Sequence, residues 1–595
     1  MKSTGLALRA ILGLAWRADR WRVLGTLAIT QAQGFGMSLL PLFLKWVTDA
    51  AQDGNRMGVL LAASAIAFAE VLAAIARMVT QTMGMRRDEN TGRVVDETLL
   101  RLSLRIPTLE HHENPQFHDK LAILQERRYM LLASFQYIVG SVVSCVQIVV
   151  TVALLVRLHR ALILLPLFSL PSMWAATRGH RFMHKAWDES AESQRKVAHL
   201  FSLATSPSAG KELRIFGLDD EMISRYTAEW TEIDRVRRRA ETREEALGVL
   251  GSVMLTVGYV GSLGLVASRA ASGDLTAGDM LMALVLAARA QMYVGVVATV
   301  FRALPEVAGL GRRLLWLEDY ADSAASQENA SSVVPDRISS GIEFCGVDFR
   351  YGTNERLALS GVTFNMPAGS TVALVGENGS GKSTVVKLLC RLYAPTAGRI
   401  AVDGISVSDF DVEQWRGRIS AGFQDFSHFE FLLRETVGVG NVEYIEDREA
   451  VEAALDRADA LALSSSLRYG LETQLGRSFA DGVDLSGGEW QKLAIGRAMM
   501  RHRPLLLILD EPTANLDAET EHILFDRYSQ AAREGAAITG GITVLVSHRF
   551  STVRRADLIV VMSQGRAVEI GSHDELMAAK GQYAEAFTAQ AAAYS

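Results

Sequence analysis

Six long apolar stretches fill most of the first half of this chain. About 20 predominantly apolar residues suffice for a helix to cross the hydrocarbon core of a bilayer, and a helix pairs its own backbone N–H and C=O groups there. The sequence therefore predicts six membrane-spanning helices. The fourth is the least regular, because it is short and contains Pro166 and Pro171. The six stretches cover residues 22–48, 57–80, 130–156, 160–177, 246–268 and 277–303.

The connections between these stretches alternate in length. Residues 81–129 and 178–245 form two long connections, and the other three are short. Arginines gather where the long connections meet the membrane, which favours a cytoplasmic position for both. Helix-forming residues are frequent in them, so we expect the spans to continue into the cytoplasm as helices. The residues before the first stretch predict an amphipathic helix on the membrane surface.

The segment RVRRR, residues 235–239, has two interpretations. It could be a site for nucleic acid or lipid headgroups, or the cytoplasmic flank that orients the fifth span. The second role is the more frequent one, so we interpret the segment as topology. The net charge of −6 is small for 595 residues and gives no sign of a nucleic-acid partner. The three cysteines lie far apart, which argues against a disulfide framework or a zinc site.

Two charged residues fall inside predicted spans. Glu70 and Arg289 each lie roughly 18 to 20 Å from the outer end of their span, at 1.5 Å per residue. Charges inside a membrane are costly and usually face a cavity or a partner. One hypothesis is that Glu70 and Arg289 pair or line a substrate path. The alternative is that each belongs to a separate structural network.

The composition changes after Tyr320. Residues 321–340 are small, polar and turn-prone, which indicates a linker. From residue 341 to residue 595, strand-like runs alternate with helical ones, as in an α/β domain. The sequence thus predicts a helical membrane domain over residues 1–320 and an α/β domain over residues 341–595.

The stretch VGENGSGKST, residues 375–384, follows a short apolar strand and opens a helix. It satisfies the pattern of a phosphate-binding loop, in which glycines let successive backbone N–H groups face phosphate oxygens. Lys382 is expected to hold the β- and γ-phosphates, and Ser383 to bind Mg²⁺. The other residues expected to contact nucleotide in this loop are Gly376, Asn378, Gly379, Ser380, Gly381 and Thr384.

A second motif, LLLILDEPTANLD at residues 505–517, predicts a buried strand that ends in two acids. Asp510 is expected to hold Mg²⁺ through water, and Glu511 to polarise the attacking water. Hydrolysis of a phosphoanhydride asks for this pairing, because a metal neutralises developing charge while a carboxylate orients the nucleophile.

The stretch LSGGEWQ, residues 485–491, closely resembles the signature motif of ATP-binding cassette (ABC) proteins. Ser486, Gly487 and Gly488 open a helix whose N-terminus can bind an anion. In that family, this helix points at the γ-phosphate of ATP held by the opposite nucleotide-binding domain. The resemblance therefore implies that the chain acts as a dimer.

Four further positions resemble functional residues of the family. Tyr351 resembles the aromatic residue that stacks on adenine, and Gln424 the glutamine that contacts Mg²⁺ and senses the membrane domain. Asp517 resembles the acid that crosses the dimer interface, and His548 the histidine that contacts the γ-phosphate. Glu489 stands where the signature usually has glutamine, and ANLD replaces the commoner SALD.

Six spans ahead of one cassette resemble an exporter-type ABC half-transporter. The resemblance implies a P-loop ATPase domain with a helical subdomain, a need for ATP and Mg²⁺, a plasma-membrane location with the ATPase domain in the cytoplasm, and a second half-transporter as partner, most simply the same chain. Two alternatives stay open, an importer with an exporter-type fold and one half of a heterodimer. The cargo is not specified, although ENPQFHDK and KELRIFGL resemble loops of bacterial peptide and natural-product exporters.

The family also has short coupling helices in its long cytoplasmic connections. The candidates here are residues 107–121 and 209–218. The first contains His111, His112 and His118, but their spacing does not support a metal site.

Overall fold

A computed structural model describes residues 2–326, 331–352, 356–511, 530, 533, 535–547 and 549–593. The chain forms two compact units. The first consists of Met1–Arg101 with Lys120–Glu318, and the second of Leu102–Asp119 with Asp319–Ser595.

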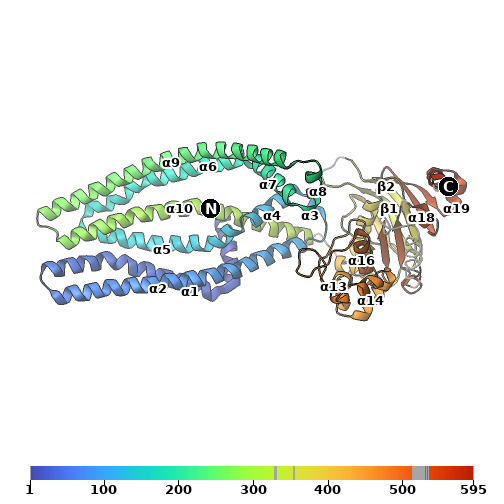
Figure 1. Ribbon diagram of the computed structural model, residues 1–595, viewed down its shortest axis with the longest axis horizontal. Coiled ribbons are helices and arrows are strands. Elements are labelled where there is room, and N and C mark those ends of the chain that lie inside the picture. The colour runs from blue at the N-terminus through green and yellow to red at the C-terminus, as the bar shows by residue number, and fades with distance from the viewer. Residues whose placement is uncertain are drawn as a thin grey trace. The chain divides into compact units, whose positions relative to one another are not determined.

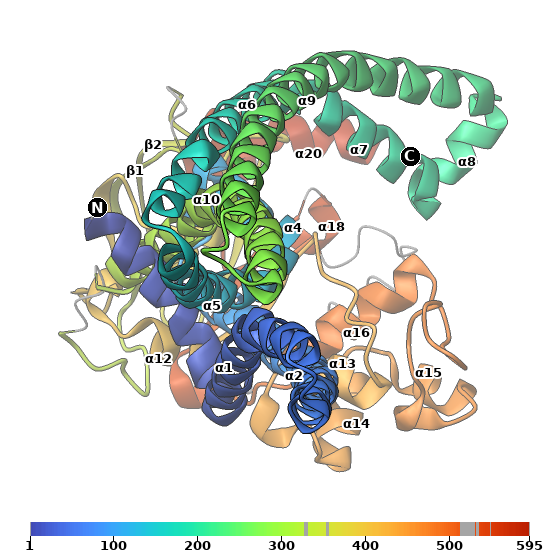
Figure 2. The ribbon, with the colours of Figure 1, turned by 90° about the vertical axis from the view of Figure 1, so that its left-hand side faces the viewer.

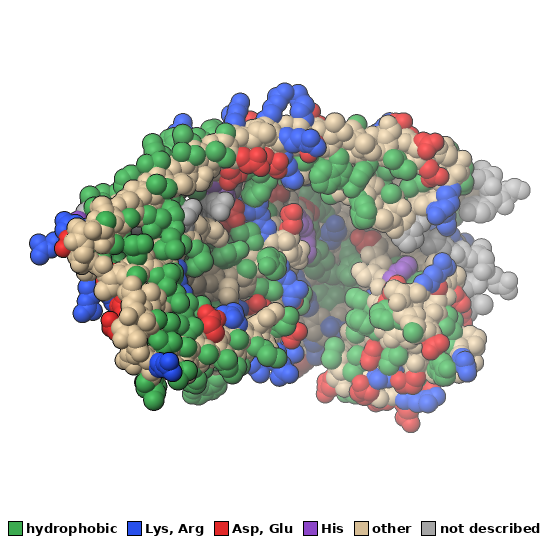
Figure 3. All heavy atoms as spheres, turned by 60° about the vertical axis from the view of Figure 1, so that its left-hand side comes forward, with side chains coloured by type: hydrophobic (Ala, Val, Ile, Leu, Met, Phe, Trp, Pro, Cys, Tyr) green, Lys and Arg blue, Asp and Glu red, His purple; other side chains and the backbone are tan. Residues whose placement is uncertain are grey.

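Long helices make up the first unit, and the longest run side by side (Figure 1). Helix α6 packs along α9, and α1 packs against α5. Figure 2, which looks along these helices, shows α6 beside α9 as well. On the face in Figure 3, hydrophobic side chains cover much of their surface. The elements are α1 (Lys2–Gln52), α2 (Arg56–Leu104), α4 (Pro115–Glu126), α5 (Arg128–Leu158), the 3₁₀ helix η1 (Arg160–Ser169), α6 (Leu170–Glu189), α7 (Ala191–Thr205), α8 (Pro207–Ile215), α9 (Asp219–Ala271) and α10 (Ala277–Ser326).

Four helices in the described part of the chain are long and apolar enough to cross a membrane: Gly5–Gln52, Arg56–Leu104, Arg128–Leu158 and Asp219–Ala271. The fourth predicted span instead begins as η1, in which Pro166 supplies no N–H for an α-helical ladder. The sixth predicted span lies in α10, so the count of six stays a prediction. A helical membrane region with long extensions is confirmed, since α2 and α9 continue far beyond their predicted spans.

A break divides α1 at Asp19, whose backbone is extended (φ −164°, ψ 82°). The Asp19 carboxylate accepts a hydrogen bond from the backbone N–H of Arg22 at 3.0 Å. Asp19 therefore acts as an N-cap for the second part of the helix. The break lies just before the first predicted span.

The second unit contains two sheets. The four-stranded sheet has the order β2-β1-β4-β5 and is antiparallel. The six-stranded sheet has the order β10-β9-β3-β8-β7-β6, and only β10 is antiparallel to its neighbour. The strands are β1 (Gly341–Phe349), β2 (Leu359–Pro367), β3 (Thr371–Val375), β4 (Ala397–Val402), β5 (Ile405–Ser406), β6 (Ile419–Gly422), β7 (Leu506–Asp510), β8 (Ile542–Val546), β9 (Leu558–Ser563) and β10 (Arg566–Gly571).

A small apolar core joins β3 and β9 to α18, α19 and α20, and two larger cores hold the rest of this unit together. One lies between the two sheets, with Trp415 and Phe410 fully buried in it. The other holds the helical part around α14 and α16 against β7. The helices are α3 (Glu110–Glu113), α11 (Lys382–Leu389), η2 (Val407–Asp409), α12 (Val412–Gly417), α13 (Leu433–Gly438), η3 (Val442–Tyr444), α14 (Arg448–Arg457), α15 (Leu461–Ser466), η4 (Gly470–Glu472), α16 (Gly487–Met499), α18 (Phe550–Val553), α19 (His573–Ala579) and α20 (Gln582–Ala593).

Residues 102–119 group with this second unit by their contacts, and the predicted domain bounds of 1–320 and 341–595 stay a prediction. The guanidinium of Arg416 donates to the Pro107 carbonyl oxygen at 2.6 Å, and the Leu109 N–H donates to the Leu392 carbonyl oxygen at 2.9 Å. The hydroxyl of Tyr393 donates to the Glu113 carboxylate. Burial and this carboxylate raise the pKa of Tyr393, which keeps the donating proton in place.

The same segment holds the three histidines of the first candidate coupling helix. His111 is buried, with Nδ1 at 2.8 Å from the Thr108 carbonyl oxygen, and Nε2 of His118 lies 2.7 Å from the His112 carbonyl oxygen. In the described residues these side chains form no group that could hold a metal ion. The second candidate, residues 209–218, falls mostly in α8.

Candidate nucleotide-binding site

A cavity of about 1,160 Å³ lies in the second unit, where the phosphate loop follows β3. Its lining brings together residues that are far apart in sequence. They include Tyr351, Gly376, Asn378, Gly379, Gly381, Lys382, Ser383, Thr384, Gln424 and Glu511. The structure thus gathers most of the predicted nucleotide-binding residues at one place.

The phosphate loop needs glycine at two of its positions. Gly376 has φ +150°, and a Cβ atom there would lie 2.1 Å from the Met562 carbonyl oxygen. Gly381 has φ +107°, and its Cβ would lie 2.7 Å from Leu359. Side chains are excluded at both positions, so the loop backbone can face the cavity. Helix α11 begins directly afterwards at Lys382, which points its positive dipole end the same way.

Lys382 is the buried cation of this loop. Its ammonium group donates to the carbonyl oxygens of Gly376 at 2.7 Å and Glu377 at 2.9 Å. Burial lowers the pKa of Lys382, and the charges of Glu511 and Asp510 oppose that effect. The Ser380 hydroxyl is buried and has no hydrogen-bond partner among the described residues. The loop therefore places one cation on the cavity wall and keeps one unused hydroxyl buried within it.

The two acids at the end of β7 have different surroundings. Asp510 is 6% exposed, and burial together with the charges of Glu511 and Asp425 raises its pKa to about 6. Its Oδ1 atom has no hydrogen-bond partner among the described residues. Glu511 has a left-handed backbone (φ +47°), with its N–H bonded to the Val546 carbonyl oxygen at 2.9 Å. The amide of Gln424 donates to the Glu511 carboxylate at 2.8 Å.

Asp510 and Ser383 have the oxygen chemistry that a magnesium ion requires. Mg²⁺ prefers hard oxygen ligands and keeps several waters, so it is bound by one or two carboxylates plus phosphate oxygens. Burial destabilises the ionised form of a carboxylate, so a buried carboxylate is stabilised strongly by a nearby cation. Asp510, with its unpartnered oxygen, and Ser383 on the cavity wall have this chemistry.

Tyr351 reaches the cavity from the end of β1. Its hydroxyl lies 3.0 Å from the Thr384 hydroxyl, and the Lys387 ammonium lies 5.3 Å from its ring centre. Its ring meets those of Phe349 and Tyr393 edge to face, with centres 4.8 and 5.3 Å away. These contacts hold the ring at the edge of the cavity.

The signature residues do not line this cavity. Ser486 is the N-cap of α16, and its hydroxyl accepts from the Glu489 N–H while the Glu489 carboxylate accepts from the Ser486 N–H. Gly487 and Gly488 are the first two residues of that helix. The departure from glutamine at position 489 therefore preserves a capping box. Asp517 and His548 lie outside the described residues.

Two residues next to the predicted set were missed. The Gln491 amide donates to the Glu511 carbonyl oxygen at 3.3 Å, which links α16 to the acid. The Trp490 ring stacks on His428, with centres 4.5 Å apart and planes 2° from parallel. His428 follows Gln424 by four positions, so this stack joins the glutamine loop to the signature helix. Both residues lie within LSGGEWQ, but the motif gives no sign of these long-range partners.

In the first unit, Arg289 donates to the Met37 carbonyl oxygen. The described residues show no ion pair between Arg289 and Glu70. Whether the two residues line a substrate path stays a prediction.

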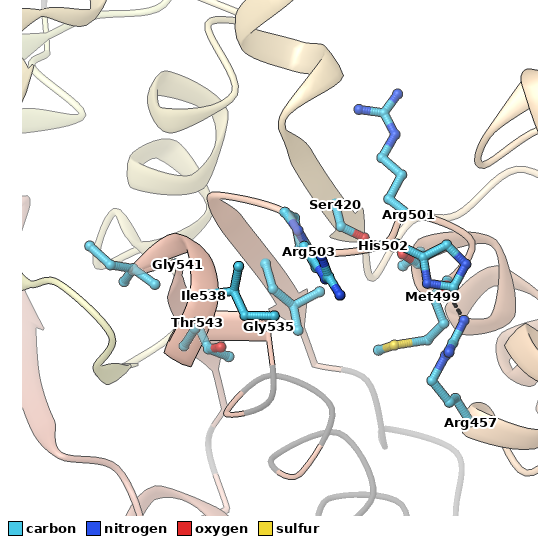
Figure 4. A pocket seen from close by; sticks show the side chains of 15 residues that line it. Ser420, Arg457, Met499, Arg501, His502, Arg503, Gly535, Ile538, Gly541 and Thr543 are labelled. Atoms are coloured by element: carbon cyan, nitrogen blue, oxygen red, sulfur yellow. Dashed lines mark hydrogen bonds between the residues drawn. The ribbon is translucent and has the colours of Figure 1, made fainter. Parts of the chain in front are cut away.

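A smaller cavity of about 240 Å³ lies elsewhere in the second unit (Figure 4). Arg457, His502 and Arg503 contribute to its lining. Burial and the charges of the two arginines lower the pKa of His502. None of the residues predicted to bind nucleotide lines this cavity.

Known proteins resemble the chain over both units. The ABC transporter family model matches residues 359–514. The subtilin transport ATP-binding protein SpaT of Bacillus subtilis is 28% identical over 483 residues, which cover 79% of this chain and 75% of that protein. The ATP-dependent lipid A-core flippase of Chromobacterium violaceum is 32% identical over 403 residues, which cover 67% of this chain and 66% of the flippase.

A solved structure of a bacterial Atm1-family ABC exporter with ATP bound matches with a TM-score of 0.77. The match covers 96% of this chain and 98% of that one, at 22% sequence identity. The exporter-type fold is thus shown over both units, and the family model covers the phosphate loop, the signature and the acidic strand. The chain belongs to the ABC transporter family, as an exporter-type half-transporter in which a membrane domain is fused to one ATP-hydrolysing domain.

Proposed function

We propose that two copies of this chain form a transporter that hydrolyses ATP with Mg²⁺ and exports a hydrophobic or peptide-like cargo. The observation that carries the proposal is the position of α16. Its N-terminus at Ser486 lies outside the cavity that gathers the phosphate loop, Gln424 and Glu511. A second chain would supply the missing helix end to that cavity.

The residues at the cavity have separate roles. The Lys382 ammonium exchanges the carbonyl oxygens of Gly376 and Glu377 for phosphate oxygens when nucleotide enters. The Glu511 carboxylate orients a water for attack on the γ-phosphate and accepts its proton. Gln424 shares a hydrogen bond with Glu511, so a movement of the glutamine loop changes the position of the acid. Asp517 and His548 are proposed to complete the interface and the γ-phosphate contact.

Asp510, Ser383 and Gln424 would hold the magnesium ion together with phosphate oxygens. The ion would neutralise negative charge on the phosphates as the bond breaks. The ionised form of Asp510 is required for this role. Occupation of the site also removes the unfavourable burial of an unpaired carboxylate.

The proposed location is the plasma membrane, with the ATPase domain in the cytoplasm. The chain is a membrane protein by its apolar helices. The names of the relatives, subtilin transport and lipid A-core flippase, support a peptide-like or lipid-like cargo. Glu70 and Arg289 are proposed to lie beside the cargo path.

The test is Mg²⁺-dependent ATP hydrolysis by the full chain, purified alone into lipid nanodiscs. We expect turnover in the wild type and its loss in Glu511→Gln, with ATP binding retained. Glu343→Gln is the matched control, because Glu343 is an exposed carboxylate on β1. Turnover near the wild-type rate in Glu511→Gln would contradict the role of Glu511. A silent wild type that still binds ATP would favour a heterodimer over a homodimer.

A further inference from the structure

A second large cavity, of about 690 Å³, lies within the first unit. Its walls come from the junction of α4 and α5, from the end of α6 and the start of α7, and from α9 and α10. The predicted topology places these helix ends on the cytoplasmic side. The volume falls in the range of about 300 to 1,000 Å³ that is usual for small-molecule sites.

Four arginines from three of these elements line the cavity: Arg127, Arg237, Arg312 and Arg313. In the described part of the chain, no ion pair or side-chain hydrogen bond is made by any of them. The Nε atom of Arg237 is buried without a partner. Arg127, Arg237 and Arg313 are half-buried, which makes the lack of partners costly.

Two arginines close to Arg237 on α9 have acidic partners, which Arg237 lacks among the described residues. Arg235 donates to Glu232 at 2.8 Å, and Arg238 lies 2.6 Å from Asp234. Both pairs are exposed to solvent, and the two residues of each pair lie about one helical turn apart. Only Arg237, among these three, lines the cavity and lacks an acidic partner.

The arginines of the cavity also repel one another. Burial, followed by the positive charges of Arg127 and Arg312, lowers the pKa of Arg313. Three acids line the same cavity: Glu126, Asp188 and Glu306. None of them forms an ion pair with these arginines among the described residues, and Glu306 lies 3.8 Å from His180 instead. An added anion would relieve this repulsion.

Apolar side chains stand beside the arginines. Ile123, Met130, Trp187 and Leu310 line the cavity. The Arg127 guanidinium lies 5.7 Å from the centre of the Trp187 ring, so a cation and an aromatic face are adjacent. The lining can therefore accept a molecule with one anionic end and one apolar end.

We propose that this cavity binds the anionic end of the cargo, a phosphate or carboxylate on an apolar body, before transport. The planar guanidinium group offers paired N–H donors that match both anions. This inference rests on the proposed transport function and specifies the class of cargo. It assigns Arg237 a binding role, whereas RVRRR was interpreted as topology alone.

The test is direct binding of two probes to the full chain without nucleotide. Octyl phosphate enters from solution, and phosphatidic acid is supplied within a phosphatidylcholine nanodisc. We expect Arg237→Gln and Arg313→Gln each to weaken binding by about tenfold, as the loss of one charged hydrogen bond implies. Arg313→Lys should retain more affinity than Arg313→Gln. Tighter binding of one probe than of the other shows whether the anionic ligand enters the cavity from solution or from the bilayer.

Arg238→Gln is the matched control, because Arg238 is paired with Asp234 and does not line the cavity. It should bind both probes as the wild type does. Circular dichroism checks that each variant remains folded. Equal binding by wild type and the Arg237→Gln, Arg313→Gln double variant would overturn the inference, as would an equal loss in Arg238→Gln.

The readout separates this inference from the proposed function. Probe binding that depends on Arg237 and Arg313, in a chain that hydrolyses no ATP, would keep the anion site and refute the transport cycle of a homodimer. ATP hydrolysis without probe binding would support the proposed function and refute the anion site.

Discussion

Neutralising Asp510 should stabilise the protein while it removes the ATPase activity. Burial and the charges of Glu511 and Asp425 raise the pKa of Asp510 from 3.8 to about 6. Between these two pH values, the folded state holds a proton that the unfolded state has released. The free energy of unfolding therefore falls as the pH rises through this window. A shift of roughly two units corresponds to about 3 kcal/mol at pH 8, at 1.36 kcal/mol per unit.

Asp510→Asn keeps the shape of the side chain but cannot ionise. We expect the variant to be more stable than the wild type by up to about 3 kcal/mol at pH 8, or about 6 to 12 °C in melting temperature. The advantage should shrink as the pH falls below 6 and should vanish below about 4. Mg²⁺ with nucleotide should stabilise the wild type but not the variant, because only the carboxylate binds the cation strongly.

Hydrogen exchange of the β7 and β8 amides in the full chain measures this difference locally. Asp403→Asn is the control, because its effect on stability should have the opposite sign. The Asp403 carboxylate accepts from the backbone N–H groups of Ser339, Ser340 and Gly341, and the pKa of Asp403 is lowered. Its neutralisation should destabilise the protein at pH 8. A less stable Asp510→Asn, or a difference that does not change with pH, would refute the reasoning.

Three further substitutions test other parts of the site. Gly376→Ala places a Cβ atom 2.1 Å from the Met562 carbonyl oxygen, so binding of a fluorescent ATP analogue should weaken more than about tenfold; unchanged binding would contradict the loop geometry. Tyr393→Phe removes the donor to Glu113, so exchange of the α3 amides should speed up by about tenfold or more, and an unchanged rate would show that the hydrogen bond does not hold the segment. Glu489→Gln keeps a capping oxygen but removes a negative charge beside the N-cap serine, so the KM for ATP should fall while the melting temperature stays constant; a higher KM would count against anion binding there.

The sequence predicted the phosphate loop well, because its strand, glycines and helix are contiguous. The meeting of Gln424 and Glu511 depends on the pairing of β6 with β7, which periodicity alone does not specify. The family resemblance assigned Gln424 a contact with Mg²⁺, but it did not predict the hydrogen bond to Glu511. One departure of the fold from expectation, the 3₁₀ start of the fourth span, occurs where a proline supplies no backbone N–H.

Two features could not be predicted because they depend on partners distant in sequence. Pro107 and Arg416 are separated by 309 positions, and no local pattern indicates their hydrogen bond. The arginines of the 690 Å³ cavity in the first unit lie in segments that the sequence shows only as membrane flanks. Their lack of acidic partners is a property of packing, so it becomes visible only when Arg127, Arg237 and Arg313 are seen to share one cavity.

The attachment of residues 102–119 to the second unit has a consequence for protein engineering. The second unit is built from two separate stretches of the chain, residues 102–119 and 319–595, and a boundary drawn at residue 341 would omit the first. A chimera that exchanges only residues 319–595 with a relative would set the native Glu113 against a foreign counterpart of Tyr393. Exchanging both stretches together keeps the two partners of each such hydrogen bond within one protein. Recombination between relatives is thus expected to succeed in pairs of segments rather than at a single crossover.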